Sequence, residues 1–248
     1  MIAVFNRELK AYFSSVLAWV LVSVYLLIVG VIVAFSIEDF ADISMMAMQG
    51  GRPANAMEQL VPPLLTTMGF LLLFFLPLLT MRLFAEERRS GTLDLLLTYP
   101  LTEAQILAGK FMASLTVVGM MLAFTLSGFV MLGRLTPLDW PALAIGYLGL
   151  LLLSAAFLAF GMWASSLTSS QLVASVLTYG GLLILWILSG IDRSGALKER
   201  FGDLSALAHL TNLTKGVLDT QDLVYFLALA TLFLFLTARV LESRKWRG

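Results

Sequence analysis

The sequence predicts an all-α membrane protein with six transmembrane helices, and three observations lead to this prediction. First, 59% of the 248 residues are hydrophobic and 13% are charged, about half the charged fraction of an ordinary soluble domain. Second, six apolar runs each approach the ~20 residues with which a helix crosses a lipid bilayer. Third, none of these runs carries an acidic residue, a lysine, an arginine or a histidine in its interior. We expect a single transmembrane domain over residues 1–248.

The chain begins with an amphipathic helix, over residues 1–14, that we expect to lie on the membrane surface. Apolar residues recur there at helical spacing, with polar residues opposite them. The apolar face comprises Ile2, Phe5, Leu9, Tyr12 and Phe13, and the polar face comprises Asn6, Arg7, Glu8 and Lys10. The apolar runs follow, and we place the six spans at 16–35, 61–81, 111–132, 143–164, 171–189 and 223–240.

The segments between the spans differ in character. Residues 36–60 are predicted to form an acidic, methionine-rich loop, 133–142 a tight turn and 165–170 an uncharged connection. The segment 190–222 is too long for a turn and too polar to span. Its second half has the spacing of a short amphipathic helix that lies at the membrane surface or dips into it. The apolar residues of this helix are Leu204, Leu207, Leu210, Leu213 and Val217.

The basic residues indicate which side of the membrane each segment faces. If the N-terminus is cytoplasmic, ten of the sixteen lysines and arginines fall in inner segments and six in outer segments. Cytoplasmic segments of membrane proteins carry such an excess. We therefore expect a multi-pass protein of the cytoplasmic (inner) membrane with both termini in the cytoplasm, and with 36–60, 133–142 and 190–222 outside.

The densest charge cluster is Glu86-Glu87-Arg88-Arg89, in the inner segment 82–110 between the second and third spans. It is followed by Gly91 and a leucine-rich stretch. The segment is too charged to lie in lipid and too rich in leucine for a plain connection. It is therefore predicted to dock a cytoplasmic partner.

Within this segment we expect a short helix around 84–97 and a break at Tyr99-Pro100. A new helix is expected from Glu103, because Thr102 and Gln105 have the spacing of a capping box. That helix leads into the third span.

The sequence also bears on the supply of energy. Ion-coupled transporters and proton relays place ionisable groups at membrane depth, so the uncharged spans disfavour an ion-coupled secondary transporter. The chain has no G-x-x-x-x-G-K-[ST] loop for ATP phosphates. We expect a non-catalytic subunit without a bound cofactor, which receives energy from a partner at 82–110.

Three stretches together resemble type-2 ABC transporter permeases, and the likeness covers essentially the whole chain. The stretch from Glu86 to Leu97, with Gly109-Lys110, resembles the motif that forms the coupling helix of that family. The stretch from Phe5 to Ser14 is similar to its interfacial helix. Segments 215–219 and 239–246 are similar to a branch that holds gliding-motility permeases and the permeases of nitrous-oxide-reductase maturation.

The resemblance implies a transporter of two permease and two ABC ATPase subunits, with ATP and Mg²⁺ on the ATPase. The second permease copy would be identical or a close paralogue, and the two would meet along their first, second and fifth spans. The expected docking residues are Glu86, Glu87, Arg88, Arg89, Gly91, Thr92, Leu93, Leu96 and Leu97. From the residues alone, these charges could instead only anchor the span at the lipid head groups.

Other polar and soft residues have two interpretations each. Five hydroxyl residues at or near membrane depth either line the translocation path or hydrogen-bond within the bundle; they are Thr66, Thr67, Ser175, Thr178 and Tyr179. The outer methionines Met45, Met46, Met48 and Met57 either ligate copper(I) or fill space as flexible apolar groups. We favour the second interpretation in both cases, and we expect His209 to be an interfacial polar residue.

Two functions of different classes fit these features. The first is an export permease driven by a separate ATPase. The second is a membrane anchor that uses the same ATPase to act on an outer-side partner without passing a substrate. Either accommodates a third outer-side or membrane subunit within the lipid bilayer, while the net charge of zero excludes nucleic acid as a partner.

Overall fold

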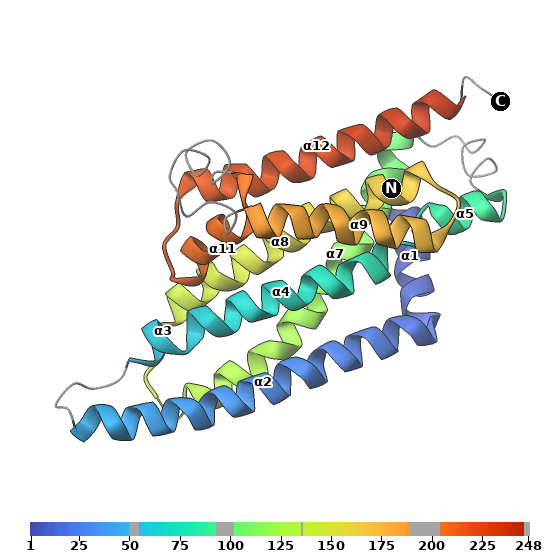
Figure 1. Cartoon of the computed structure of the whole chain (residues 1–248). Helices are drawn as coiled ribbons and strands as arrows, with labels where there is room; N and C mark the ends of the chain where they lie inside the picture. Colours follow the sequence, from blue (N-terminus) through green and yellow to red (C-terminus); the bar gives the residue numbers. More distant parts are fainter. Residues whose placement is uncertain (50–54, 93–101, 135, 189–203, 246–248) are drawn as a thin grey trace.

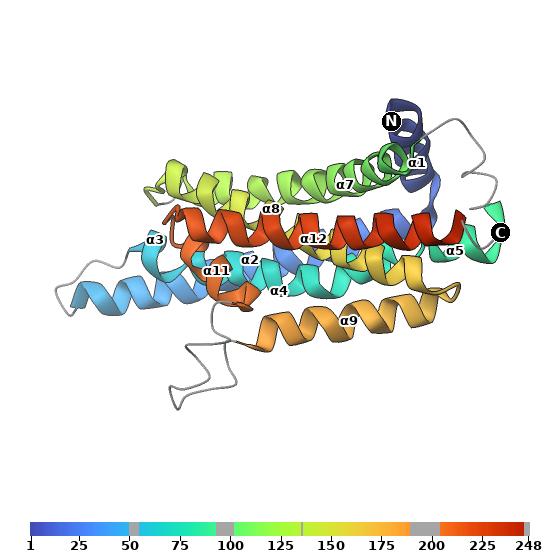
Figure 2. The ribbon, with the colours of Figure 1, turned by 90° about the horizontal axis from the view of Figure 1, so that it is seen from above.

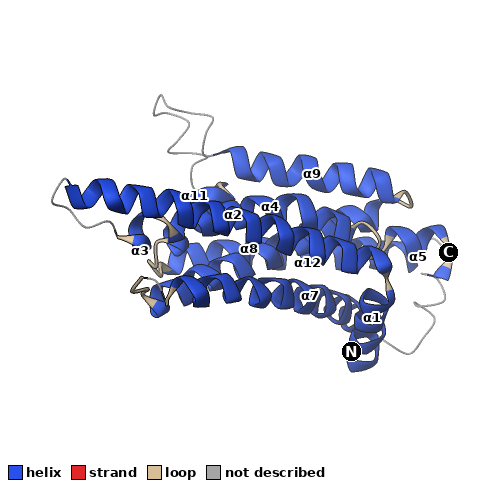
Figure 3. Ribbon diagram, turned by 90° about the horizontal axis from the view of Figure 1, so that it is seen from below, coloured by secondary structure: helices blue, strands red, loops and turns tan. Residues whose placement is uncertain are grey.

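The structure, a computed structural model, describes residues 1–49, 55–92, 102–134, 136–188 and 204–245. These residues form helices and short connections, and no β-strand occurs among them (Figure 3). The helices are α1 Ile2–Ser14, α2 Val16–Gln49, α3 Ala56–Gln59, α4 Val61–Thr80, α5 Ala85–Arg89, α7 Glu103–Leu132, α8 Trp140–Leu167, α9 Gln171–Ile187, α11 Ala206–Thr214 and α12 Thr220–Lys245. The all-α prediction is confirmed.

Six long helices run side by side: α2, α4, α7, α8, α9 and α12 (Figures 1 and 2). Five apolar helical stretches of the described chain are long enough to cross a membrane, and α9 is a shorter apolar helix of 17 residues. Both termini, α1 and α5 lie at one end of the bundle, which we call the terminal end. The helices α3 and α11 lie toward the opposite end.

The centre of the bundle is α8, which packs against α12, α4, α11, α9 and α7. Small residues let its neighbours approach closely. A Cβ added at Gly149 would lie 2.8 Å from the Leu213 Cβ of α11, and one at Gly161 would collide with the Thr80 side chain of α4. Two edge helices, α2 and α12, bury much less of their apolar surface within the chain.

The first span differs from the prediction, because α2 continues through the acidic stretch to Gln49. The predicted loop 36–60 was therefore wrong in its first half. No glycine or proline interrupts the sequence between Gly30 and Gly50, and Phe40 packs into the core one turn after Ser36. At 1.5 Å per residue, the 34 residues of α2 extend about 50 Å, well beyond the ~30 Å hydrocarbon layer.

One connection at the terminal end is also shorter than predicted. The prediction of a loop at 165–170 was wrong in its first half, because α8 continues to Leu167 and Ser170 caps the start of α9. The capping box of Thr102 and Gln105 is confirmed, and α7 runs unbroken from Glu103 to Leu132.

The predicted amphipathic helix within 190–222 is present as α11, but it does not lie at the surface. Its residues Ala206, Leu210 and Leu213 are fully buried, and the helix packs against α8, α4 and α12. The second of the two placements considered, dipping inward, is the one observed, because the glycines of α8 leave room for it.

Candidate functional site

A buried lysine joins three helices at the terminal end of the bundle. The Lys110 Nζ donates to Glu8 Oε1 of α1 at 3.0 Å, to Glu87 Oε1 of α5 at 2.8 Å and to the Leu83 carbonyl at 2.9 Å. Only 1% of the Lys110 side chain is exposed. A buried ammonium is tolerated only where it is paired and hydrogen-bonded, and all three of its donors are used here.

Arg7 completes this charge cluster from the surface. Its guanidinium lies 2.6 Å from Glu8 Oε1 and 2.9 Å from Glu87 Oε1. Burial alone would raise the pKa of the Glu8 carboxyl, but the adjacent Lys110 and Arg7 charges outweigh burial and lower that pKa. Two carboxylates thus share two cations, and we call Arg7, Glu8, Glu87 and Lys110 the charge cluster.

The buried face of α1 explains why Glu8 reaches the cluster. Val4, Glu8 and Tyr12 recur every four residues and are the buried residues of this helix, which packs along α7. Gly109 permits this contact, since an added Cβ would lie 2.9 Å from Val4 Cβ. The predicted assignment of Glu8 to a solvent face was wrong, because its partner Lys110 lies in the bundle.

Tyr12 extends the attachment of α1 by one turn. Its hydroxyl lies 3.0 Å from Ser114 Oγ of α7 and 3.4 Å from the Leu79 carbonyl of α4. Burial raises the pKa of Tyr12 to about 12, so the hydroxyl stays a neutral hydrogen-bond donor. The helix α1 is therefore fixed to both α4 and α7.

The first turn of α5 is fixed to α8 by one hydroxyl. Ser165 Oγ accepts from the backbone N–H groups of Phe84 and Ala85 at 3.1 and 3.0 Å, and donates to the Met81 carbonyl at 3.1 Å. Helix N-termini leave such N–H groups without intrahelical partners. At the other end, Arg88 donates to the Leu167 carbonyl at 2.6 Å, so both ends of α5 are held by α8.

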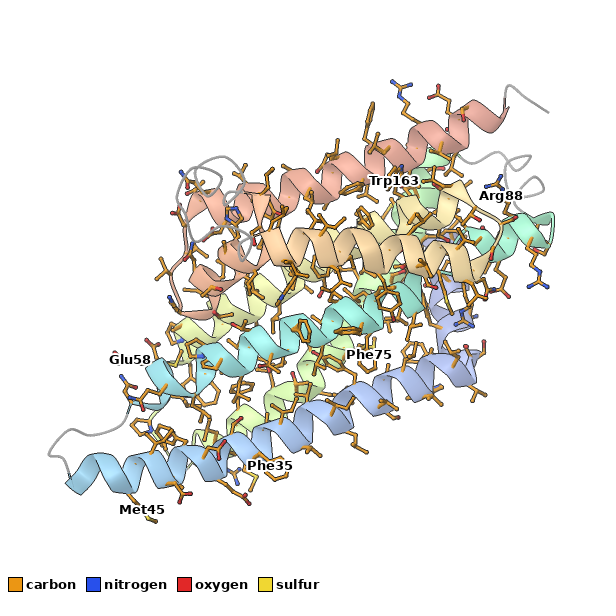
Figure 4. The ribbon with its side chains drawn as sticks, in the orientation of Figure 1. Phe35, Met45, Glu58, Phe75, Arg88 and Trp163 are labelled. Carbon is orange, nitrogen blue, oxygen red and sulfur yellow. The ribbon has the colours of Figure 1, made fainter. Side chains whose placement is uncertain are left out.

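The structure divides the four predicted docking charges into two kinds. Glu87 and Arg88 are bound to the rest of the chain, whereas Glu86 and Arg89 are exposed. Figure 4 shows Arg88 on α5 at the terminal end, and Met45 and Glu58 at the opposite end. Docking of a partner can therefore use Glu86 and Arg89 directly.

The predicted helix over 84–97 is wrong as one continuous element. α5 ends at Arg89, and Gly91 follows with φ +70°, a conformation that glycine adopts without strain. Thr92 is exposed and its hydroxyl lies 2.9 Å from Ser90 Oγ. The predicted docking residues Leu93, Leu96 and Leu97, and the predicted break at Tyr99-Pro100, lie outside the described residues.

The five candidate path residues fall on α4 and α9, which pack together. Four of the hydroxyls donate to carbonyls of their own helices, at 2.7 to 2.9 Å: Thr66, Thr67, Ser175 and Thr178. The fifth, the Tyr179 hydroxyl, crosses to the Phe74 carbonyl of α4 at 2.6 Å. These bonds favour a role in the bundle, and a role in a translocation path stays a prediction.

His209 is placed within the bundle rather than at a surface. Its Nδ1 lies 2.5 Å from Asp222 Oδ1, and its ring stacks on Tyr225 with centroids 4.1 Å apart. We expected His209 to be an interfacial polar residue, and that expectation did not include its contacts with Asp222 and Tyr225, which link α11 to α12. Of the outer methionines, Met45 is exposed and Met57 packs on the core, while the side chains of Met46 and Met48 lie outside the described part.

Sequence reasoning identified the α5 charges but missed Lys110 and Arg7 as the partners of Glu87, and Ser165 as the acceptor for the first N–H groups of α5. One available signal was Lys110 itself, a lone charge directly before an apolar run and preceded by a glycine. Such a position requires a counter-charge.

A comparison with models of protein families identifies a family for this chain. The family model described as "ABC-2 family transporter protein" matches residues 2–246. No curated protein matches the chain.

Proposed function

Because this chain belongs to the ABC-2 family of transporter proteins, and is thus a membrane subunit of an ABC transporter, we propose that α5 is the element through which a separate ABC ATPase drives it. In this proposal the chain is the permease that exports a substrate. A partner ATPase is implied for the family in general.

The observation that supports this role is the attachment of α5. It is too short to be stable alone, since isolated helices need roughly 12–15 residues. Here the charge cluster ties it to α1 and α7, and Ser165 and Leu167 tie it to α8. A movement that the ATPase imposes on the exposed side of α5 would therefore be transmitted to the spans α7 and α8, rather than be taken up by a flexible loop.

The terminal end of the bundle is proposed to face the cytoplasm. It holds Met1, α5 and the end of α12, and its segments carry nine of the eleven basic residues of the described chain, an excess typical of cytoplasmic segments. An ATPase in the cytoplasm would then meet α5. Of the buried charged residues of the described chain, Glu8 lies on α1 outside the spans, and Lys110 and Asp222 directly precede the apolar runs 111–132 and 223–240. None of them lies at the centre of a span, where ion coupling would need it.

A second copy of the chain, or a close paralogue, is proposed to complete the transporter. The edge helix α2 leaves large apolar side chains exposed along its length, among them Val20, Val24, Leu27 and Val31. Such a surface faces lipid or another subunit. The resemblance implies a contact along this first span, together with the second and fifth, and the exposed apolar face of α2 supports that proposal.

One observation favours the alternative of a mechanically acting anchor. The hydroxyls of α4 and α9 are engaged in bonds within the chain, so these helices do not present an evident polar path. In that case the same ATPase would move α8 and, through it, the buried α11 at the opposite end. A third subunit on that side would receive the movement.

Reversal of the exposed charges tests the proposed role of α5. The double variant Glu86→Lys with Arg89→Glu should lose co-purification of the ATPase while the chain still inserts in the membrane. Lys215→Glu, at an exposed position on the opposite side of the bundle, is the matched control and should retain the ATPase. Unchanged retention in the double variant would contradict the proposal.

A further inference from the structure

A cleft of about 410 Å³ lies beside the charge cluster, between α1, the end of α4, α5 and α7. Six of its lining side chains are charged, three basic and three acidic: Arg7, Glu8, Arg82, Glu86, Glu87 and Lys110. Apolar side chains of α1 and α4 complete the wall. The cleft is thus strongly charged but balanced, a composition suited to a ligand that carries both signs.

The lengths of the spans place this cleft at the membrane surface. The 20 residues of α4 extend about 30 Å at 1.5 Å per residue, which is the thickness of the hydrocarbon layer. The cleft begins where α4 ends, at Leu79 and Arg82. On α7, Lys110 directly precedes the apolar run 111–132, which is long enough to cross. Both spans put the cleft level with the lipid head groups.

Some of the charged groups that line the cleft keep hydrogen-bonding or ion-pairing capacity that no described residue satisfies. Glu87 Oε1 binds Lys110 and Arg7, but Glu87 Oε2 is buried and has no hydrogen-bond partner among the described residues. Leaving a buried carboxylate oxygen unpaired costs free energy. Among the described residues, Arg82 donates to Ser15 Oγ at 3.2 Å and neither it nor Glu86 forms an ion pair.

We propose that this cleft binds the head group of phosphatidylethanolamine. The primary ammonium donates to Glu86 and, with a rotation of the Glu87 carboxylate toward the cleft, to Glu87 Oε2. The phosphate accepts from Arg82, so each unused group gains a partner of opposite charge. The acyl chains then lie along α4 toward the hydrocarbon layer. Glu86 is also a residue of the proposed ATPase contact, so the lipid site is tested on the purified chain without the ATPase, where a failure of one proposal is distinguishable from a failure of the other.

The same chemistry separates this lipid from other common lipids. A choline head group has no N–H to donate, so it leaves Glu87 Oε2 unpaired. A glycerol head group has hydroxyl donors, but its phosphate adds one negative charge to a cleft that is already balanced. Ethanolamine alone supplies both a donor and zero net charge.

The test is native mass spectrometry of the purified full-length chain, titrated with phosphatidylethanolamine, phosphatidylcholine and phosphatidylglycerol of identical acyl chains. Since charge-assisted hydrogen bonds contribute more than neutral ones, the expected preference for ethanolamine is about tenfold. Equal retention of the three lipids would overturn the proposal. So would binding of free phosphoethanolamine as tightly as the lipid, since the site would then serve a soluble ligand.

Variants locate the site on this cleft. Arg82→Gln and Glu86→Gln should each reduce the ethanolamine preference severalfold, because each removes one charged contact while leaving the Lys110 contacts in place. Arg89→Gln is the matched control, since Arg89 is exposed on the same helix and does not line the cleft. An unchanged preference in both cleft variants, or an equal loss in the control, would contradict the assignment.

Discussion

Lys110 and Glu87 are 23 residues apart in the chain, and their Nζ and Oε1 atoms lie 2.8 Å apart in a site that excludes almost all solvent from the lysine. Glu87 lies on α5 and Lys110 on α7. The contact therefore joins the two ends of the 82–110 segment. Glu8 of the N-terminal helix α1 binds the same lysine. Three elements from different parts of the sequence are joined through one ammonium group.

Replacing this lysine should be costly. Lys110→Met keeps most of the apolar volume but leaves the carboxylates of Glu8 and Glu87 without their central counter-charge. Removal of one partner from a buried ion pair destabilises a protein by about 3–5 kcal/mol, so the free energy of unfolding in mixed micelles should fall by a comparable amount.

A triple variant separates the effect of charge from the effect of packing. Combining Lys110→Met with Glu8→Gln and Glu87→Gln removes the uncompensated charges and should restore much of the lost stability, because whole ion pairs can be replaced at little cost. If the triple variant is as unstable as the single variant, packing rather than charge compensation explains the loss.

Ser165 is predicted to matter for the position of α5. Ser165→Ala leaves the N–H groups of Phe84 and Ala85 without their acceptor, which should cost about 1–3 kcal/mol and weaken ATPase retention. Ser154→Ala is the matched control, since Ser154 is buried on the same helix but bonds only to the Leu150 carbonyl of that helix. Equal retention in both variants would show that α5 is positioned by other contacts.

Acid should weaken the charge cluster. The pKa of Glu8 is below its ordinary value of 4.5 in the folded chain. Its contribution to stability is therefore fully present above that ordinary value and is lost as the pH falls through the lower, folded-state pKa. Thermal unfolding midpoints at neutral pH and at about pH 3.5 should differ more for the native chain than for Glu8→Gln. The same acid shift in both would exclude Glu8 as the titrating group.

Two glycines should respond in opposite ways to alanine. Gly161→Ala brings a methyl group against Thr80 and should destabilise the α4–α8 contact by about 1–3 kcal/mol. Gly180→Ala meets no atom within 4 Å and should leave the stability unchanged or slightly higher. Unfolding titrations of the two variants measure this, and comparable losses would contradict the packing of α8 on α4.

The sequence predicted the fold correctly where a single physical signal determined the local structure. Apolar length located the long apolar helices, and Thr102 with Gln105 located the start of α7. The prediction failed for α2, because acidic residues such as Asp39 were taken to end a helix that continues to Gln49. It also failed to choose between a surface and a buried α11, since the room for Leu213 comes from Gly149 of another helix.

The candidate site could be predicted from the sequence only in part, for a similar reason. The charges of α5 are conspicuous in the sequence, but which of them turn inward depends on Lys110 and Leu167, which are distant in the chain. Glu8 sits between Arg7 and Leu9 in a charged stretch of the sequence and gives no local sign of burial. Pairing of charges across helices is a property of the packed bundle rather than of any one segment.

The central claim is that the exposed side of α5 meets the ATPase, and cysteine cross-linking tests it most directly. The chain contains no cysteine, so Arg89→Cys introduces one unique thiol on α5 and Lys215→Cys introduces one on the opposite side of the bundle. With a short thiol-to-amine cross-linker in native membranes, we expect the ATPase to be captured from position 89 and not from position 215. Capture from position 215 alone, or equally from both positions, would contradict the account.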